Sequence, residues 1–508
     1  MDKCRLLALL LCSFVLVATS SPGAQVRPQE RPLEPHGNLD LRNWREKNKS
    51  DLLISRKSLG DAIAALATRR SESSLVSNAI RVNGDLLPPG GAAQPETQAE
   101  PFLAINPENS SHLVAVYQES RFANGGARVL NHSVSFDGGE SWTEGMLPHL
   151  TPPSGGPWER ASDPWVTFGP GGRVYFASLL INNSNRDNAI GVSLSTDGGL
   201  SWGPPIEVAR SSIDFNDKEA VAADAFPSSP HFGNVYVAWD VNKFDANNQI
   251  TKQVLAVSRS TDNGATWNPF KKLHKKKFNL GAVPAVGPDG TVYVVWTHFK
   301  SPNAPVNPKV FFSRSEDGGE TWSPAIAVVT MASRDVAGIR AGEGLVSFAV
   351  NPINGDLFLA WMDSRWAGTS QATVAYSRDR GNTWSTPQRV SDGPDDAHAF
   401  TVSVAVNRRG EVGVSYYSLR NDPARASLTD CYLNVSRDGG LSFEPARRVT
   451  EQSFDLRFAA QTGEFFLGDY IGLVGTDGGF QLLWIGTDLN SAINPSRKQP
   501  DVFTAAAE

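Results

Sequence analysis

Short runs rich in apolar residues, some with apolar residues two apart such as Val192 and Leu194, recur along the chain from about residue 79 to residue 505. Clear examples are Phe102–Asn106, His112–Tyr117 and Phe480–Trp484. Runs of this kind, bounded by glycine, proline, asparagine and aspartate, predict short β-strands with at least one buried face. The pattern therefore predicts an all-β fold for most of the chain.

Six copies of an eight-residue turn, Ser-x-Asp-x-Gly-x-x-Trp/Phe, separate these runs. In such a turn the aspartate folds back onto the backbone, the glycine supplies a positive φ, and the aromatic ring anchors the hairpin. One octapeptide is weak evidence, but six at separations of 55 to 65 residues predict a repeat architecture. The aspartates of these Ser-x-Asp turns are Asp137, Asp197, Asp262, Asp317, Asp379 and Asp438.

The turns resemble the Asp boxes of the sialidase-like, or BNR-repeat, propellers, over roughly residues 98 to 506. The resemblance implies a β-propeller of four-stranded blades. Beyond the last turn, three further strand-like runs could form a blade, but the fourth strand of that blade is missing. Residues 79–83 are a predicted strand without a partner before the first blade. Pairing that strand with the last blade would close the ring and leave no exposed edge. Seven blades are therefore favoured, with six blades and a C-terminal cap as the alternative.

The N-terminus predicts a targeting segment. Lys3 and Arg5 precede an apolar run from Leu6 to Val17, which small residues follow. This order is typical of a secretory signal peptide, and the run is too short to span a bilayer. We expect a secreted or periplasmic protein without a membrane span. The expected parts are a signal peptide at 1–24, a linker and short helical arm at 25–78, and the propeller at 79–508.

Composition narrows the classes of function. Charged residues make up 20% of the chain and the formal net charge is −6, so nucleic acid is not an expected partner. The 45 glycines, 33 prolines and 13 tryptophans suit a turn-rich β-protein. Eight histidines leave little material for a metal cluster, and no contiguous calcium loop occurs. We expect no cofactor or metal, and a monomer that binds a glycan or other carbohydrate.

In a propeller, the links into the first strands and out of the second strands surround the mouth of the central channel, which is the default ligand site. Charged residues recur in both kinds of link. Acids precede several first strands, and which of Asp217 and Glu219 points inward depends on a register that the sequence leaves open. A basic residue also recurs four positions after the aromatic residue that ends a second strand. The acids are Glu100, Asp163, Asp217, Glu219 and Asp469; the bases are Arg121, Lys243, Lys300, Arg365 and Arg420.

The resemblance to sialidases implies roles for some of these residues. Arg121, Arg365 and Arg420 would clamp a substrate carboxylate, and Glu100 and Glu219 would add to the substrate-binding surface. Asp163 or Asp469 would act as the acid/base, and Tyr417 or Tyr470 as the nucleophile. The Phe-Arg-Ile-Pro signature of sialidases is absent. Solvated charges that pair with the neighbouring blade explain the recurring bases equally well.

Three functions remain open at this point. The leading hypothesis is an exo-glycosidase of sialidase type that acts on an acidic glycan. The alternative is a non-catalytic propeller that binds a glycan or a protein. A hydrolase or lyase on another polysaccharide is the third, and a lyase would need a base such as His298 or His398.

Overall fold

The computed structural model describes residues 76–88, 90–274, 276–301, 307–422, 424–425, 427–487 and 499–508. The predicted signal peptide and all but the last three residues of the predicted arm lie outside them. Antiparallel β-strands dominate, so the all-β prediction is confirmed. The described helical segments are the short 3₁₀ turns η2 (Pro152–Ser154), η3 (Pro170–Gly172) and η4 (Leu456–Phe458). None of the helices in these ranges is long and apolar enough to cross a membrane.

The strands hydrogen-bond to their neighbours in chain order, in groups of four. The first two groups are joined by a single pair, Ala127 with Ala161. These groups are β2 (Gln98–Asn106), β3 (Asn109–Arg121), β4 (Ala127–Ser135) and β5 (Thr143–Met146), and β6 (Arg160–Phe168), β7 (Val174–Ile181), β8 (Asn188–Ser195) and β9 (Ile206–Ser211).

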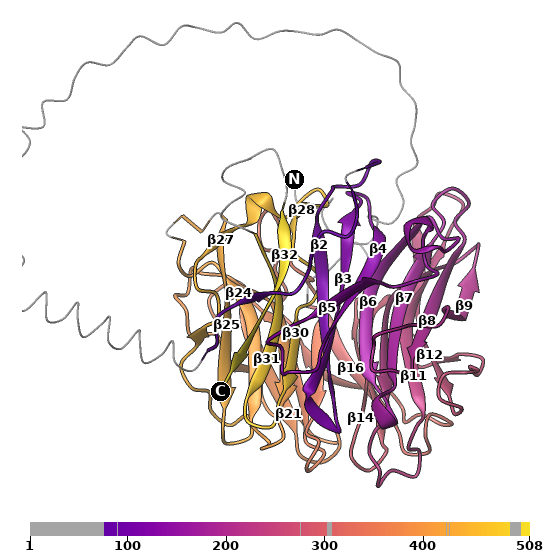
Figure 1. The fold of residues 1–508 in the computed structure, drawn as a ribbon. Helices are drawn as coiled ribbons and strands as arrows, with labels where there is room; N and C mark the ends of the chain where they lie inside the picture. Colours follow the sequence, from indigo (N-terminus) through magenta and orange to yellow (C-terminus); the bar gives the residue numbers. More distant parts are fainter. Residues whose placement is uncertain are drawn as a thin grey trace, which may run out of the picture. The chain divides into compact units, whose positions relative to one another are not determined.

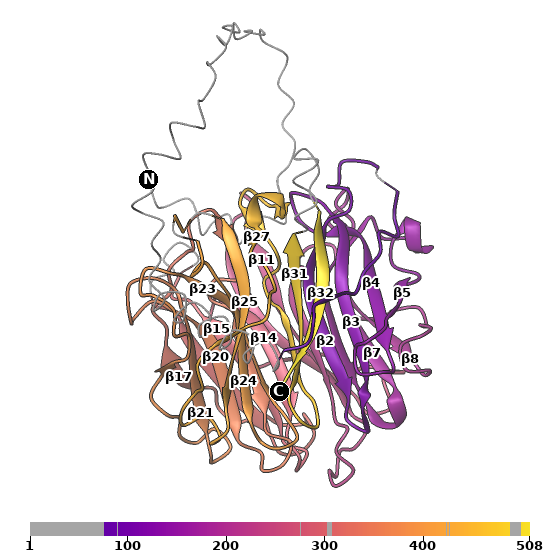
Figure 2. The ribbon, with the colours of Figure 1, turned by 60° about the vertical axis from the view of Figure 1, so that its left-hand side comes forward.

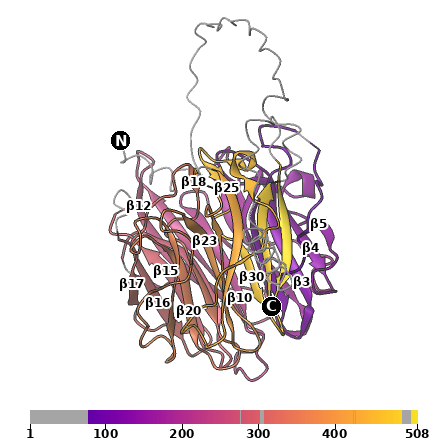
Figure 3. The same cartoon turned by 90° about the vertical axis from the view of Figure 1, so that its left-hand side faces the viewer.

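Four further groups follow in the same order, and strands of neighbouring groups such as β20 and β23 run side by side (Figure 3). They are β10 (Phe215–Ala223), β11 (Val235–Phe244), β12 (Ile250–Ser260) and β13 (Lys271–Lys272); β14 (Asn279–Val286), β15 (Val292–His298), β16 (Lys309–Ser315) and β17 (Ile326–Thr330); β19 (Val346–Val350), β20 (Leu357–Asp363), β21 (Gln371–Ser377) and β22 (Gln388–Arg389); and β23 (Ala399–Val406), β24 (Val412–Ser418), β25 (Leu428–Ser436) and β26 (Arg447–Arg448).

The last group combines the two ends of the described chain. It contains β30 (Gly472–Gly475), β31 (Phe480–Thr487) and β32 (Pro500–Ala507), and β1 (Ile80–Arg81) pairs with β32. β30, β31 and β32 also contact β2, so the yellow and indigo ends of the chain lie side by side (Figures 1 and 2). The first strand of each group likewise contacts the first strand of the next group.

A small additional sheet forms from two separate stretches of the chain, one before β19 and one before β30. It consists of β18 (Ile339–Arg340), β28 (Ala460–Gln461) and β29 (Phe465–Phe466), and β18 runs parallel to β29. A further short strand, β27 (Phe454–Asp455), pairs with β25. This small sheet holds Arg340 and Phe466, both of which contribute to the site described below.

The Ser-x-Asp turns connect third strands to fourth strands and share one hydrogen-bond pattern. In the turn at Asp197, Ser195 Oγ donates to Asp197 Oδ1 at 2.8 Å and accepts from Gly199 N at 2.8 Å. Ser201 N donates to Asp197 Oδ1 at 2.9 Å. The hydrogen bonds from Ser201 lower the pKa of Asp197 to about 2, so the carboxylate stays charged. Gly199 has a φ of 98°, which glycine adopts without strain.

Candidate functional site

β-Bulges interrupt the first strands near the ends at which the chain enters them. The register shifts between Ala99 and Phe102 in β2, between Ser162 and Trp165 in β6, and between Asp217 and Ala220 in β10. β14 and β23 carry the same irregularity. A bulge breaks the two-residue alternation of a strand and re-aims side chains. The alternating pattern of the sequence therefore could not decide between Asp217 and Glu219.

Charged residues with a positive φ occupy three of these bulges. The φ angles are 54° at Glu100, 52° at Asp163 and 55° at Lys218. A non-glycine residue in such a conformation costs about 1–3 kcal/mol and persists where the surroundings hold it in place. Strain of this kind clusters at functional sites. The bulges bring together a charged cluster that consists of Glu100, Arg121, Asp163, Asp217, Lys218, Glu219, Arg340 and Asp469.

Lys218 lies at the centre of the charged cluster. Its Nζ forms ion pairs with Asp469, with Asp163 Oδ2 at 3.3 Å and with Glu100 Oε1 at 4.0 Å. The Lys218 side chain is 14% exposed, and the three carboxylates are buried. Burial lowers the pKa of Lys218, but the charges of Asp163 and Asp469 more than offset this and raise the pKa above its usual value. The ammonium group is therefore charged at neutral pH.

Arg340 is a second cationic partner of Asp469. Its Nε donates to Asp469 Oδ1 at 3.0 Å, and its second contact, to Asp469 Oδ2, is 2.5 Å long. Burial raises the pKa of Asp469, but Arg340 and Lys218 more than offset this and hold it well below the usual value. The Phe466 ring contacts two guanidinium groups, with Arg340 Cζ 4.6 Å and Arg121 Cζ 4.3 Å from its centroid. Asp469 is therefore a fixed carboxylate.

Other acids of the charged cluster hold their protons more strongly than usual. Burial and the charge of Asp163 raise the pKa of Glu100 to about 7 and that of Asp217 to about 7. The same two causes raise the pKa of Glu219 well above its usual value. Glu219 is 2% exposed, and neither of its carboxyl oxygens has a hydrogen-bond partner among the described residues. Glu219 is therefore a carboxyl group without a hydrogen-bond partner among the described residues, and burial favours its protonated, neutral form.

The charged cluster adjoins a cavity of about 690 Å³. Strands β2, β6, β10, β14, β19, β23 and β30 all contribute residues to its wall, which is mainly apolar. Asp163, Lys218, Glu219 and Asp469 line the cavity where the chain enters these strands. The volume lies within the range of small-molecule sites, about 300–1,000 Å³, and an apolar wall with a few convergent polar groups is typical of them.

Three aromatic rings line the cavity beside these charges. The Phe102 ring stacks on Trp165 with a centroid distance of 3.8 Å, and Tyr470 lies edge-on to Trp165 at 5.3 Å. The Tyr470 hydroxyl donates to the carbonyl of Pro164 at 3.0 Å. Burial and the charge of Glu100 raise the pKa of Tyr470 well above its usual value. A neutral, engaged phenol is poorly suited to the nucleophile role implied by the resemblance.

The charged cluster brings together most of the predicted acids but only one arginine of the predicted clamp. Glu100, Asp163, Glu219 and Asp469 belong to it, as does Arg121, whose Nη1 lies 3.8 Å from Glu100 Oε2. Arg365 instead binds Asp363 through Nε at 2.9 Å and Nη2 at 2.8 Å. Arg420 lies 2.8 Å from Asp392 and packs on the Tyr432 ring at 4.0 Å.

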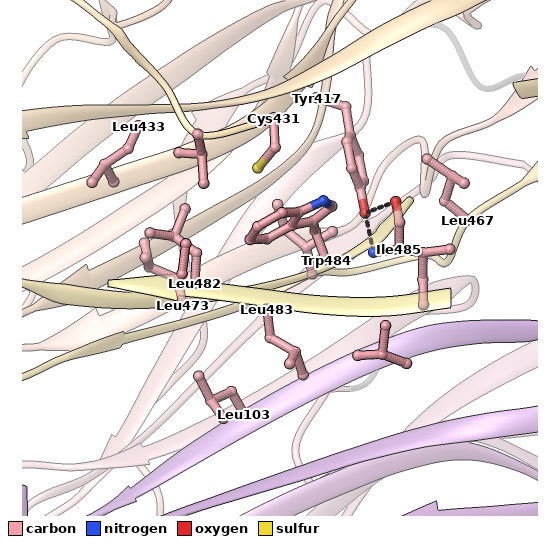
Figure 4. Packing of buried hydrophobic residues seen from close by; sticks show 14 of the residues in the cluster. Leu103, Tyr417, Cys431, Leu433, Leu467, Leu473, Leu482, Leu483, Trp484 and Ile485 are labelled. Carbon is pink, nitrogen blue, oxygen red and sulfur yellow. Dashed lines mark hydrogen bonds between the residues drawn. The ribbon is translucent and has the colours of Figure 1, made fainter. Parts of the chain in front are cut away.

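Tyr417 lies in a hydrophobic cluster between β24 and β31 (Figure 4). Its hydroxyl accepts a hydrogen bond from Ile485 N at 2.9 Å and contacts Ile485 O at 3.3 Å. Burial raises the pKa of Tyr417 well above its usual value. The side chain is fully buried, and its hydroxyl bonds to the backbone of Ile485 rather than to the charged cluster. This placement gives Tyr417 a packing role.

His298 and His398, the two histidines that a lyase could use as a base, have contacts outside the charged cluster. His298 contacts the carbonyl of Phe278 at 3.2 Å and the His274 ring, and His398 accepts a hydrogen bond from Ser370 N at 3.2 Å. No group of three or more His, Cys, Asp or Glu side chains that could hold a metal ion occurs within the described ranges.

Sequence reasoning missed Arg340 and the aromatic wall. Arg340 lies in a two-residue strand, which is too short to leave a periodic signal. A signal for the wall does exist: Glu100-Pro101-Phe102 and Asp163-Pro164-Trp165 repeat an acid–proline–aromatic triplet at the same place in two groups. Proline within a strand marks a bulge or an edge, so the triplet could have located both the acids and the rings.

The chain matches no protein-family model and no curated protein. Several solved structures are similar at low identity. The Hadza microbial sialidase Hz136 is 16% identical with a TM-score of 0.45, over 85% of this chain and 95% of its own. The α-L-arabinofuranosidase from Fusarium graminearum in complex with an iminosugar inhibitor is 13% identical with a TM-score of 0.45, over 72% and 99%. The α-L-arabinanase from Penicillium chrysogenum complexed with arabinobiose is 14% identical with a TM-score of 0.44, over 67% and 94%.

Proposed function

We propose that this protein is a glycoside hydrolase whose active site is the charged cluster at the end of the cavity. The observation that carries the proposal is the contrast between two carboxyl groups that line the same cavity. Glu219 is a buried acid without a hydrogen-bond partner among the described residues, and its pKa is raised. Asp469 is held charged by Arg340 and Lys218. Environments that push the pKa values of neighbouring carboxyl groups apart distinguish a general acid from a carboxylate.

Glu219 and Asp163 then react with the substrate, while Asp469 holds Lys218 beside Asp163. Glu219 donates its proton to the glycosidic oxygen as the bond from that oxygen to the anomeric carbon breaks. Asp163 lines the cavity, and its Oδ2 has Lys218 as an ionic partner at 3.3 Å. It stabilises the developing positive charge and accepts the proton of the water that attacks the anomeric carbon. Trp165 and Tyr470 supply an apolar wall for the sugar ring.

The substrate need not carry a carboxylate. A sialidase-type clamp requires three arginines that converge on one anion, whereas Arg365 and Arg420 are bound to Asp363 and Asp392. Arg121 faces Glu100, so its charge is also offset. These pairings favour a glycosidase that acts on a neutral glycan over one that acts on an acidic glycan.

The proposal includes a closed, seven-bladed propeller. Supporting it, the first strands contact one another in chain order, β30 contacts β2, and β1 pairs with β32. A ring closed by the N-terminal strand would leave no free sheet edge and would place the cavity at its axis. The charged, apolar and small-residue order of residues 3–20 supports secretion as the route by which the enzyme reaches a glycan.

A panel of aryl glycosides tests the proposal. It should include α-L-arabinofuranosides, hexosides, hexosaminides, uronides and sialosides. We expect hydrolysis of at least one, and a loss of about 10²- to 10⁴-fold in kcat for Glu219→Gln on that substrate. Glu144→Gln is the matched control. Burial raises the pKa of Glu144 too, to about 7, but this acid bonds to Gly84 N and Tyr117 away from the cavity.

The outcomes separate the functions. Hydrolysis of sialosides alone, with a loss in Arg365→Ala, would support the sialidase-type alternative instead. Binding of glycans without turnover would support the non-catalytic propeller. Equal activity of Glu219→Gln and Glu144→Gln would remove Glu219 from the reaction and contradict the proposal.

A further inference from the structure

Residues 246–315 carry a charge balance opposite to that of the whole chain. They include ten lysines and arginines but only two acids, Asp262 and Asp289, whereas the formal net charge of the protein is −6. Five of the lysines fall within residues 271–277. Asp262 follows the end of β12 and Asp289 precedes the start of β15, so neither acid lies at the end of β15 or the start of β16. Lysine-rich runs of this kind are typical of surfaces that bind anions.

Basic side chains gather around Phe311 at the end of β15 and the start of β16. Lys276 Nζ lies 4.8 Å from the centroid of the Phe311 ring, and the rings of His274 and His298 lie 4.7 Å and 5.6 Å from it. Lys309 is paired with His298 in the register of the two strands. The basic patch is defined here as His274, Lys276, His298 and Lys309. None of these four described residues lines the cavity, so the basic patch is a separate surface.

The positive charge of the basic patch is not offset by acids. Lys276 and Lys309 are exposed and have no ion-pair partner in the described part of the chain, whereas Lys271 of the same run pairs with Glu320 Oε2 at 3.3 Å. Burial, the neighbouring histidine and the two lysines lower the pKa of His298 to about 4. Cations held together without a counter-charge repel one another, and an anionic group among them removes that repulsion. The basic patch therefore suits an anionic ligand.

We propose that the basic patch binds an acidic polysaccharide, with the sulfate or carboxylate groups of the polymer at Lys276 and Lys309. Nucleic acids are commonly bound by the planar fork of arginine and by exposed rings on which bases stack. The basic patch offers lysines instead, and its central ring, Phe311, is only 5% exposed. Charge without a stacking surface suits a polymer of anionic sugars better. The inference goes beyond hydrolysis, because this second surface anchors the protein on an acidic polymer while the cavity takes a neutral sugar.

Four polymers test the inference on the unmodified protein by calorimetric titration: dextran sulfate, polygalacturonate, neutral dextran and a DNA duplex. We expect dextran sulfate and polygalacturonate to bind with an affinity that falls as the salt concentration rises, because binding releases counterions. Neutral dextran should bind about tenfold or more weakly than dextran sulfate, since two lysines contribute about fivefold each near an anionic surface. Binding of neutral dextran as tight as that of dextran sulfate, or tighter binding of the DNA at equal charge concentration, overturns the inference.

Variants locate the binding surface. The double variant Lys276→Gln, Lys309→Gln should bind dextran sulfate about tenfold or more weakly, and its slope of log affinity against log salt should fall by about one for each lysine removed. Lys271→Gln is the matched control from the same run, and because Glu320 already offsets this lysine, it should change the affinity by less than about twofold.

His298 reports where the polymer binds. An anion beside the lysines offsets their charge, so the pKa of His298, followed by NMR, should rise when dextran sulfate is added. Equal losses in Lys271→Gln and the double variant, or an unchanged pKa of His298 at saturation, overturn the inference. None of these measurements requires turnover, so their outcome is independent of the glycosidase proposal.

Discussion

Replacing Lys218 by methionine removes the cation that three buried carboxylates share. Methionine keeps most of the length of the side chain, so the change isolates the charge. In the altered protein Asp163, Asp469 and Glu100 lose an ionic partner that lies within 4.0 Å of each. Removal of one partner from a buried ion pair costs about 3–5 kcal/mol, because the remaining charge is left unpaired. We expect a loss of this size in the free energy of unfolding at about pH 7.

The loss should depend on pH in a defined direction. Lys218 and Arg340 hold the pKa of Asp469 below its usual value in the folded protein. The ion pairs therefore contribute stability above the usual carboxyl pKa of about 4, and this contribution declines as the pH falls toward the folded pKa. In Lys218→Met the uncompensated carboxylates take up protons instead. The difference between the two proteins should thus shrink between about pH 7 and about pH 4.

Urea titrations of both proteins at the two pH values measure the effect, with Lys243→Met as the control. Lys243 pairs with Asp214 at 2.5 Å, but the two side chains are 40% and 25% exposed. An exposed pair is worth about 0–1 kcal/mol. If Lys218→Met costs no more than Lys243→Met, or if its cost grows as the pH falls, the reasoning about the charged cluster is refuted.

Three further results are expected. Tyr417→Phe should lower the free energy of unfolding by about 1–3 kcal/mol, because the hydrogen bonds to Ile485 are lost. Hydrolysis and ligand binding should be unchanged, and a selective loss of activity would show that Tyr417 acts in the reaction. Arg365→Ala should lower the free energy of unfolding, because the buried carboxylate of Asp363 loses its ionic partner. Ligand affinity should stay within about twofold, and a large loss of affinity would support a role of Arg365 in a carboxylate clamp. The raised pKa values of Glu100 and Asp217, both about 7, mean that the folded protein binds more protons than the unfolded chain above about pH 4. Stability should therefore fall as the pH rises toward 7, by up to about 1.4 kcal/mol per pH unit for each group, and Glu100→Gln should reduce this slope in urea titrations; a rising curve would contradict the assignment.

The sequence predicts the β-structure well because its signals are local. The Ser-x-Asp turns need only eight neighbouring residues, and their hydrogen bonds close within that span. The sequence also indicated the acids of the charged cluster as candidate site residues, since they precede strands that the pattern identifies. The alternation of a regular strand cannot show a bulge, so the sequence left open which of Asp217 and Glu219 points inward.

The partners of the arginines were beyond sequence reasoning. Arg121, Arg365 and Arg420 occupy equivalent positions in their repeats, which suggested one shared role. Their roles differ because their surroundings do: Arg365 has Asp363 two residues earlier, and Arg420 meets Asp392 from a distant loop. The pair Arg340–Asp469 joins residues 129 positions apart through a small sheet that no pattern announces.

The central claim is tested most directly by measuring how the rate loss in Glu219→Gln depends on the leaving group of the substrate. A general acid matters most when the departing oxygen is basic, so the substitution should slow an alkyl or unactivated aryl glycoside by about 10²-fold or more. It should slow the dinitrophenyl glycoside of the same sugar by less than about tenfold, because that phenolate leaves without a proton. An equal loss on both substrates, or no loss on either, would contradict the assignment of Glu219 as the proton donor.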